Sequence, residues 1–96
     1  EYYSWRSKEK PHSQVDMIIE RADHLINFCE IKYAYAEYAI EVSEERKFRN
    51  RVASFVRESQ TRCGILSTWI TPYGLYQNEY AANVQYEITM NDLFAT

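Results

Sequence analysis

Two short apolar runs around a tight polar loop constrain the fold of this chain more than any other feature of its sequence. The runs cover residues 14–20 (QVDMIIE) and 25–33 (LINFCEIKY), and both contain many residues that favour strands. Only residues 21–24 separate them. Two strand-like runs joined by so short a polar segment predict a β-hairpin.

The length of the hairpin loop decides which side chains share a face. If the loop comprises residues 22–24, Ile18 lies opposite Phe28 and Asp16 lies opposite Glu30. Side chains alternate between faces along a strand, so Lys32 lies on the face of Glu30. A shift of one residue would move Asp16 to the other face. The hairpin therefore predicts two carboxylates and one ammonium group together at the end away from the loop.

The rest of the sequence predicts further strands and one amphipathic helix. Phe48, Val52 and Phe55 recur with helical spacing, and Ser43 is the expected N-cap of that helix. Residues 34–42 suit either a strand or the lead-in to the helix. The expected elements are strands at 2–6, 14–20, 25–33, 63–71 and 83–89, a helix at 43–59 and a short helix ending at 94. This order predicts a single α/β domain with a mixed sheet.

Composition limits the partners and the compartment that we expect. The formal net charge of −3 argues against a strong nonspecific grip on nucleic acid. Cys29 and Cys63 lie in apolar runs, and their spacing suits neither a disulfide framework nor a zinc site. They are expected to be reduced core thiols of a cytoplasmic protein. No apolar run is long enough to span a membrane.

Basic residues gather in the predicted helix. Five of the eleven Lys and Arg residues fall between positions 46 and 57. Arg46 and Arg57 lie roughly opposite the apolar stripe, on the side that the helix turns away from the core. Two interpretations remain open for them: a solvated face, or a track that binds the phosphate backbone of nucleic acid.

Asp16 and Glu30, opposed beside apolar neighbours, would repel each other, and their burial would be costly. A hard divalent cation such as Mg²⁺ would offset that cost, because it binds oxygen ligands and commonly uses one or two carboxylates. Lys32 would then orient an attacking water or neutralise phosphate charge. Spacing alone leaves open a plain ion pair between Lys32 and either acid.

The same residues give the chain a resemblance to a known superfamily. Asp16, thirteen further residues and then Glu30-Ile31-Lys32 resemble the D…(D/E)xK signature of the PD-(D/E)xK nucleases. Residues 13–33 (SQVDMIIERADHLINFCEIKY) are similar to the C-terminal nuclease-like region of a group of bacterial AAA-type ATPases. The later pieces FRNRVASF, TPYGLYQNEY and EITMNDLF also look like that region. The resemblance thus covers most of the chain.

The resemblance implies a restriction-endonuclease-like core, with helices flanking a central mixed sheet, and metal-dependent hydrolysis of phosphodiester bonds. It implies that Asp16, Glu30 and the backbone carbonyl of Ile31 bind Mg²⁺ or Mn²⁺ and that Lys32 positions the water. Gln14 would support the geometry of the substrate. We therefore expect the C-terminal piece of a longer ATPase, without the first core helix of the superfamily.

Three functions stay open on the sequence. The first is a nuclease-like enzyme that acts on nucleic acid, with DNA as the expected substrate. The second is a noncatalytic module that docks onto the rest of its own ATPase chain or forms a homodimer. The third is a nucleic-acid binder without catalysis, in which Arg46 and Arg57 matter and Asp16 does not.

Overall fold

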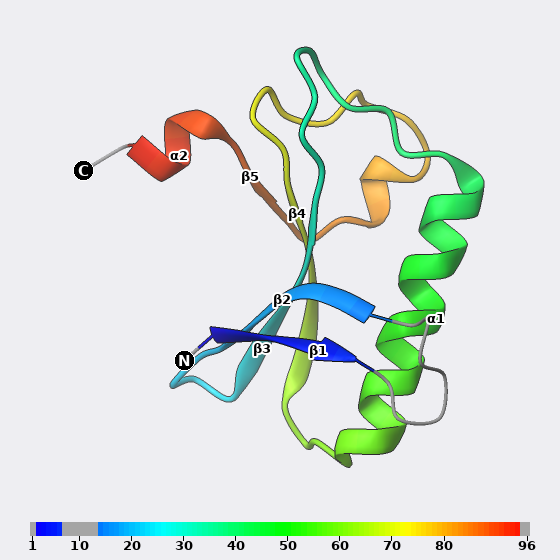
Figure 1. Cartoon of the computed structure of the whole chain (residues 1–96), viewed down its shortest axis with the longest axis vertical. Helices are drawn as coiled ribbons and strands as arrows, with labels where there is room; N and C mark the ends of the chain where they lie inside the picture. Colours follow the sequence, from blue (N-terminus) through cyan, green and yellow to red (C-terminus); the bar gives the residue numbers. More distant parts are fainter. Residues whose placement is uncertain (1, 7–13, 95–96) are drawn as a thin grey trace.

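The computed structural model of the chain describes residues 2–6 and 14–94 (Figure 1). These residues form strands and helices in an order that the sequence largely predicts. In chain order the elements are β1 (Tyr2–Arg6), β2 (Gln14–Glu20), β3 (Leu25–Ile31), α1 (Val42–Ser59), β4 (Gly64–Ile70), the 3-10 helix η1 (Ala81–Asn83), β5 (Tyr86–Ile88) and α2 (Met90–Phe94).

The hairpin of β2 and β3 has the predicted register. Ile18 lies opposite Phe28, and the same alignment holds along the whole paired part of the two strands. The N–H of Arg21 donates to the carbonyl of Leu25 at 2.9 Å and closes the loop. His24 completes the turn in the left-handed region, with a φ of 64°. The loop of residues 22–24 therefore sets the expected register for residues 17–20 against residues 26–29, and the predicted pair of Asp16 with Glu30 lies beyond the end of that ladder.

The five strands form one mixed sheet in the order β1-β2-β3-β4-β5. The first three strands are antiparallel neighbours, whereas β3, β4 and β5 run parallel. Parallel pairing of β3 with β4 requires a crossover, and α1 is that crossover. The predicted α/β class with a mixed sheet is confirmed. At this level of detail the arrangement is compatible with a restriction-endonuclease-like core.

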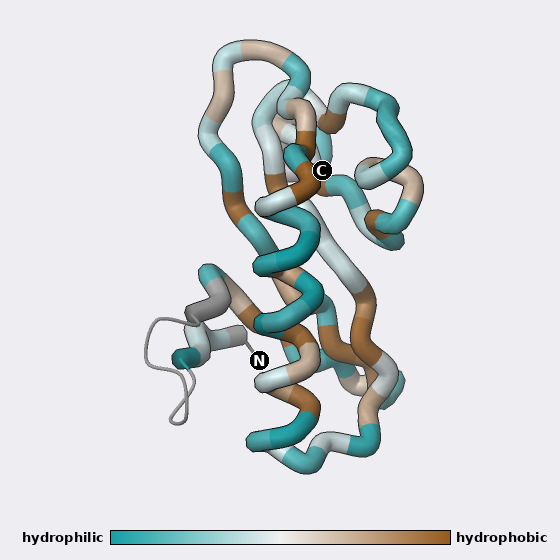
Figure 2. Tube along the Cα trace, turned by 90° about the vertical axis from the view of Figure 1, so that its right-hand side faces the viewer, coloured by the Kyte–Doolittle hydropathy of each residue, from teal (hydrophilic) through white to brown (hydrophobic). Residues whose placement is uncertain are grey.

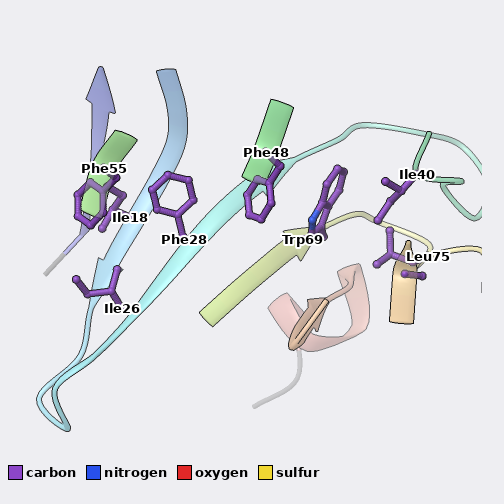
Figure 3. Close-up of a cluster of buried hydrophobic side chains, with 9 residues drawn as sticks. Ile18, Ile26, Phe28, Ile40, Phe48, Phe55, Trp69 and Leu75 are labelled. Carbon is purple, nitrogen blue, oxygen red and sulfur yellow. The ribbon is translucent and has the colours of Figure 1, made fainter. Parts of the chain in front are cut away.

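Aromatic rings join α1 to one face of the sheet. Phe28 of β3 contacts Phe48 and Phe55 of α1, with ring centroids 5.6 and 5.4 Å apart. Phe48 also contacts Trp69 of β4 at 5.6 Å. Figure 3 shows these rings in one row, with Ile18 beside Phe55 at one end. In Figure 2, where α1 faces the viewer, most of the helix is hydrophilic and hydrophobic residues recur at intervals.

The start of α1 differs from the prediction. The helix begins at Val42, and its N-cap is Glu41, so the expectation that Ser43 caps the helix was wrong. The N–H of Glu41 donates to the carboxylate of Glu44 at 3.1 Å. The carboxylate of Glu44, the third helical residue, thus accepts from the backbone N–H of the N-cap residue, as in a capping box. Ser43 is exposed in the first turn.

Three strands are shorter than predicted, and β4 (Gly64–Ile70) lacks only one residue at each end of the expected 63–71. β3 ends at Ile31 and not at residue 33, although the N–H of Lys32 still donates to the carbonyl of Ile70 at 3.0 Å. β5 covers only Tyr86–Ile88 of the expected 83–89, and the 3-10 helix η1 precedes it at Ala81–Asn83. The short C-terminal helix is present as α2, and Thr89 donates its N–H to Asp92 at 2.8 Å.

The segment between β3 and α1 is neither of the two expected structures. Tyr38 forms an isolated bridge to Leu75, in which its N–H donates to the carbonyl of Gly74 and its carbonyl accepts from Tyr76, each at 2.9 Å. The Tyr38 ring stacks on Trp69 with centroids 6.2 Å apart. These contacts hold Tyr38 beside the loop that follows β4.

None of the described helices is both long and apolar enough to cross a membrane.

Truncation of Phe55 tests the core. Phe55 is only 2% exposed, whereas its neighbour Val56 is 40% exposed. We expect Phe55→Ala to lower the free energy of unfolding by about 3–5 kcal/mol, because it leaves a cavity between α1 and β3. Val56→Ala, the matched control, should change it by less than about 0.5 kcal/mol. Urea denaturation followed by circular dichroism measures both, and equal losses would contradict this packing.

Candidate functional site

The candidate site lies where β2 and β3 separate. Their regular pairing ends at Met17 opposite Cys29. Beyond that point β2 stays paired with β1, whereas the backbone N–H of Ile31 donates to Oδ2 of Asp16 at 2.9 Å. The Asp16 carboxylate therefore accepts the hydrogen bond from Ile31 that a backbone carbonyl of β2 would accept in a continuous ladder. Asp16 is exposed at this opening.

Glu30 is the buried acid of the site, with 6% of its surface exposed. Its Oε1 accepts a hydrogen bond from Nη1 of Arg51 on α1 at 2.8 Å. Burial raises the pKa of Glu30 to about 7, and the neighbouring Asp16 carboxylate adds to that rise. The positive charges of Arg51 and Lys32 act in the opposite direction. The Asp16 carboxylate is thus near enough to Glu30 to disfavour the charged form of Glu30.

Lys32 lies on the same side of the sheet and pairs with α1. Its Nζ is 3.3 Å from Oε2 of Glu44, and that carboxylate also accepts a hydrogen bond from the Tyr38 hydroxyl. Burial favours a higher pKa for Glu44, but the hydrogen bonds from Tyr38, the Glu41 backbone and Lys32 outweigh it and lower that pKa. Lys32 is therefore held in an ion pair with Glu44, which was not one of the two acids considered for it.

An open polar pocket of about 410 Å³ joins these side chains. It lies between the end of β3 and the first turns of α1. The residues that line it are Glu30, Lys32, Tyr38, Glu41, Ser43, Glu44, Lys47 and Arg51. Three acidic and three basic side chains are among them, so the pocket suits a ligand that carries charge.

The other predicted substrate residues are not at this pocket. Arg46 and Arg57 are exposed on α1, and at 100° per residue they lie nearly opposite the Phe48–Phe55 side of the helix. The structure therefore does not bring them to Glu30. Gln14 belongs to β2 by its backbone, but its side chain lies outside the described residues.

Arg51, Tyr38 and Glu44 are the site residues that the sequence did not single out. Arg51 follows Phe48 by three positions and precedes Phe55 by four, so the helical period places it beside the buried stripe. That spacing is a signal that the sequence contains. Tyr38 and Glu44 gave no such signal, because their contacts depend on the irregular segment before α1.

The cysteines carry no chemistry in this site. Cys29 is buried on the opposite face of β3, and burial raises the pKa of its thiol to about 11, so the thiol stays protonated. Cys63 is half-buried and not in a disulfide. The expectation of reduced thiols packed against the core agrees with this placement.

The oxygen atoms at the opening are of the kind that Mg²⁺ prefers as ligands. Asp16 and Glu30 offer carboxylate oxygens, and the Ile31 carbonyl points to the same neighbouring strand as its N–H, which donates to Asp16. Within residues 2–6 and 14–94, no group of three or more His, Cys, Asp or Glu side chains is arranged to hold a metal. A cation here would use two carboxylates, one carbonyl and water, as Mg²⁺ commonly does.

No protein-family model matches this chain, and no curated protein or solved structure was found to be similar to it.

The raised pKa of Glu30 predicts a pH dependence of stability. A raised folded-state pKa means that the folded protein binds the proton more tightly than the unfolded chain, so the stability falls as pH rises from about 5 to about 7. Glu30→Gln removes the titrating group and should flatten the profile in this window. Urea denaturation at half-unit pH steps measures the difference, which should be on the order of 1–3 kcal/mol. Parallel profiles for the two proteins would contradict the assignment.

Proposed function

We propose that this chain is a divalent-metal-dependent nuclease-type domain that hydrolyses phosphodiester bonds, and that it belongs to a longer ATPase. The observation that carries the proposal is the opening between β2 and β3, where Asp16 meets the buried Glu30 beside Lys32. Two acids with an ammonium group at one sheet opening suit phosphoryl chemistry, which depends on a positioned cation and a positioned nucleophile. The sequence resemblance supports the same class.

The residues of the site would have two roles, one in binding the cation and one in positioning the water. Asp16, Glu30 and the Ile31 carbonyl would hold Mg²⁺ or Mn²⁺, which when bound supplies positive charge to the phosphate oxygens in the transition state. Lys32 would leave its ion pair with Glu44 and orient the water that attacks phosphorus. The alcohol of the sugar leaves as the P–O bond breaks. Lys32 already lines the pocket together with Glu30.

Substitution of the two polar groups tests this proposal. Asp16→Asn keeps an acceptor for the Ile31 N–H but removes the charge that a cation needs, and Lys32→Met removes the ammonium group. Each should reduce Mg²⁺-dependent cleavage by about 10²–10³-fold, as the loss of one electrostatic group does in other enzymes. Gel assays on single-stranded DNA, duplex DNA and RNA with Mg²⁺ or Mn²⁺ measure the rates.

Glu20→Gln is the matched control, because Glu20 is an acid of the same strand, β2, but lies at the loop end of the hairpin. It should cleave at the rate of the parent chain. Equal rates for the parent chain and Asp16→Asn would overturn the proposal, and so would calorimetry that detects no binding of Mg²⁺ or Mn²⁺ by the parent chain.

A second function is a noncatalytic docking or dimerisation module, and an exposed aromatic patch favours it. Tyr33 and Tyr35 are 88% and 100% exposed. With Ala34, Pro72, Tyr73 and Met90 they line a mostly apolar hollow of about 230 Å³. Exposed apolar patches of this kind commonly mark contact sites for other proteins.

A double substitution distinguishes the two functions. If the patch is an interface between two copies, the chain should sediment as a dimer at micromolar concentration, and Tyr33→Ser with Tyr35→Ser should give a monomer, because the patch loses its apolar rings. Analytical ultracentrifugation measures the mass. Val42→Ser, which also removes an exposed apolar side chain, is the control. A parent chain that is monomeric and cleaves nucleic acid would rule out this alternative.

A further inference from the structure

Arg51 neutralises the buried acid of the site. The Nη1 to Oε1 distance to Glu30 is 2.8 Å, and the two side chains are 25% and 8% exposed. Among the described residues, the Arg51 side chain donates its hydrogen bond to Glu30. A guanidinium group has several further N–H donors. Arg51 is therefore equipped to bind a second acceptor.

A divalent cation and Arg51 would compete for Glu30. An arginine does not lose its charge in proteins, so the competition cannot be relieved by deprotonation. The Arg51 guanidinium is 2.8 Å from Glu30, so a cation bound to Asp16 and Glu30 would lie close to it. Two positive charges that share one carboxylate repel each other. Binding of the cation therefore favours the release of Arg51 from Glu30.

The released guanidinium would stay in the pocket. The backbone of Arg51 is fixed in α1, and the pocket of about 410 Å³ that contains Arg51 is also lined by Lys32 and Lys47. Neither Arg51 nor Lys47 has another carboxylate partner among the described residues. Guanidinium groups bind phosphate oxygens with paired N–H donors, so a phosphate in this pocket is the natural second acceptor.

We infer that Arg51 exchanges partners as the site fills: it holds Glu30 when no divalent cation is bound, and it binds a phosphate of the nucleic acid once the cation takes Glu30. This inference rests on the proposed function. Cation and nucleic acid then strengthen each other's binding, because each favours separation of Arg51 from Glu30. Such coupling is reciprocal between the two ligands. Arg51 is a binding and positioning residue in this scheme.

The affinity for the cation is the first measurement. Isothermal titration of Mg²⁺ into the chain without nucleic acid should give a Kd about tenfold lower for Arg51→Gln than for the parent, because no guanidinium competes for Glu30. Arg51→Lys keeps a positive charge beside Glu30 and should fall between them. This second variant keeps the test valid if Arg51→Gln does not fold without Mg²⁺.

The affinity for nucleic acid is the second measurement. A fluorescein-labelled single-stranded oligonucleotide is titrated with protein in EDTA and in Ca²⁺, which takes the same oxygen ligands as Mg²⁺. The parent chain should bind about tenfold more tightly with Ca²⁺, within the usual range of coupling between sites. Arg51→Gln should lose this gain. Lys47→Gln, the control in the same pocket, should weaken binding but keep the gain.

The outcomes separate the two proposals. If the parent and both Arg51 variants bind Mg²⁺ equally, or if Arg51→Gln keeps the full gain with Ca²⁺, the partner exchange is overturned and the nuclease proposal stands. If neither the parent nor the variants bind a divalent cation, the proposed function fails and this inference fails with it.

Discussion

The position of β3 is the constraint on which the rest of the structure depends. This strand pairs with β2 on one edge and with β4 on the other, and its seven pairs with β4 run without interruption from Leu25 to Ile31. Alternation along the strand directs Phe28 into the core beneath α1, and the same alternation directs Glu30 to the same side two residues later. The register of β3 with its two neighbours therefore positions both the core residue Phe28 and the site residue Glu30.

Burial of Glu30 is the energetic problem that this arrangement creates. A carboxylate that loses water is strongly disfavoured without a partner, and Arg51 is that partner. A buried ion pair commonly contributes no more stability than apolar residues of the same volume. The fold by itself thus gives no reason for an acid at this position, whereas the proposed binding of a cation would give one. The raised pKa of Glu30 also supports a functional site, because strongly shifted pKa values are common at such sites.

The features that could be predicted were those encoded in a short stretch of chain. The register of β2 and β3 followed from a three-residue loop. The amphipathic period predicted a helix at 43–59, and α1 covers Val42–Ser59. The N-cap was wrong because Glu41 and Glu44 cap the helix together. Lys32 was placed on the correct face, but its partner Glu44 could not be foreseen, since it depends on how the chain turns between β3 and α1.

The sequence by itself determined the mixed α/β class, the register of the hairpin and the common face of Phe28 and Glu30, because strand alternation and loop length are local properties. Asp16 does not follow from alternation, because β2 is irregular between its pairs with Tyr3 and Trp5. Only the tertiary structure decided that β2 leaves β3 at Asp16 and that Arg51 of α1 meets Glu30. These outcomes depend on how α1 lies across the sheet, and that orientation is set by contacts between residues far apart in the chain.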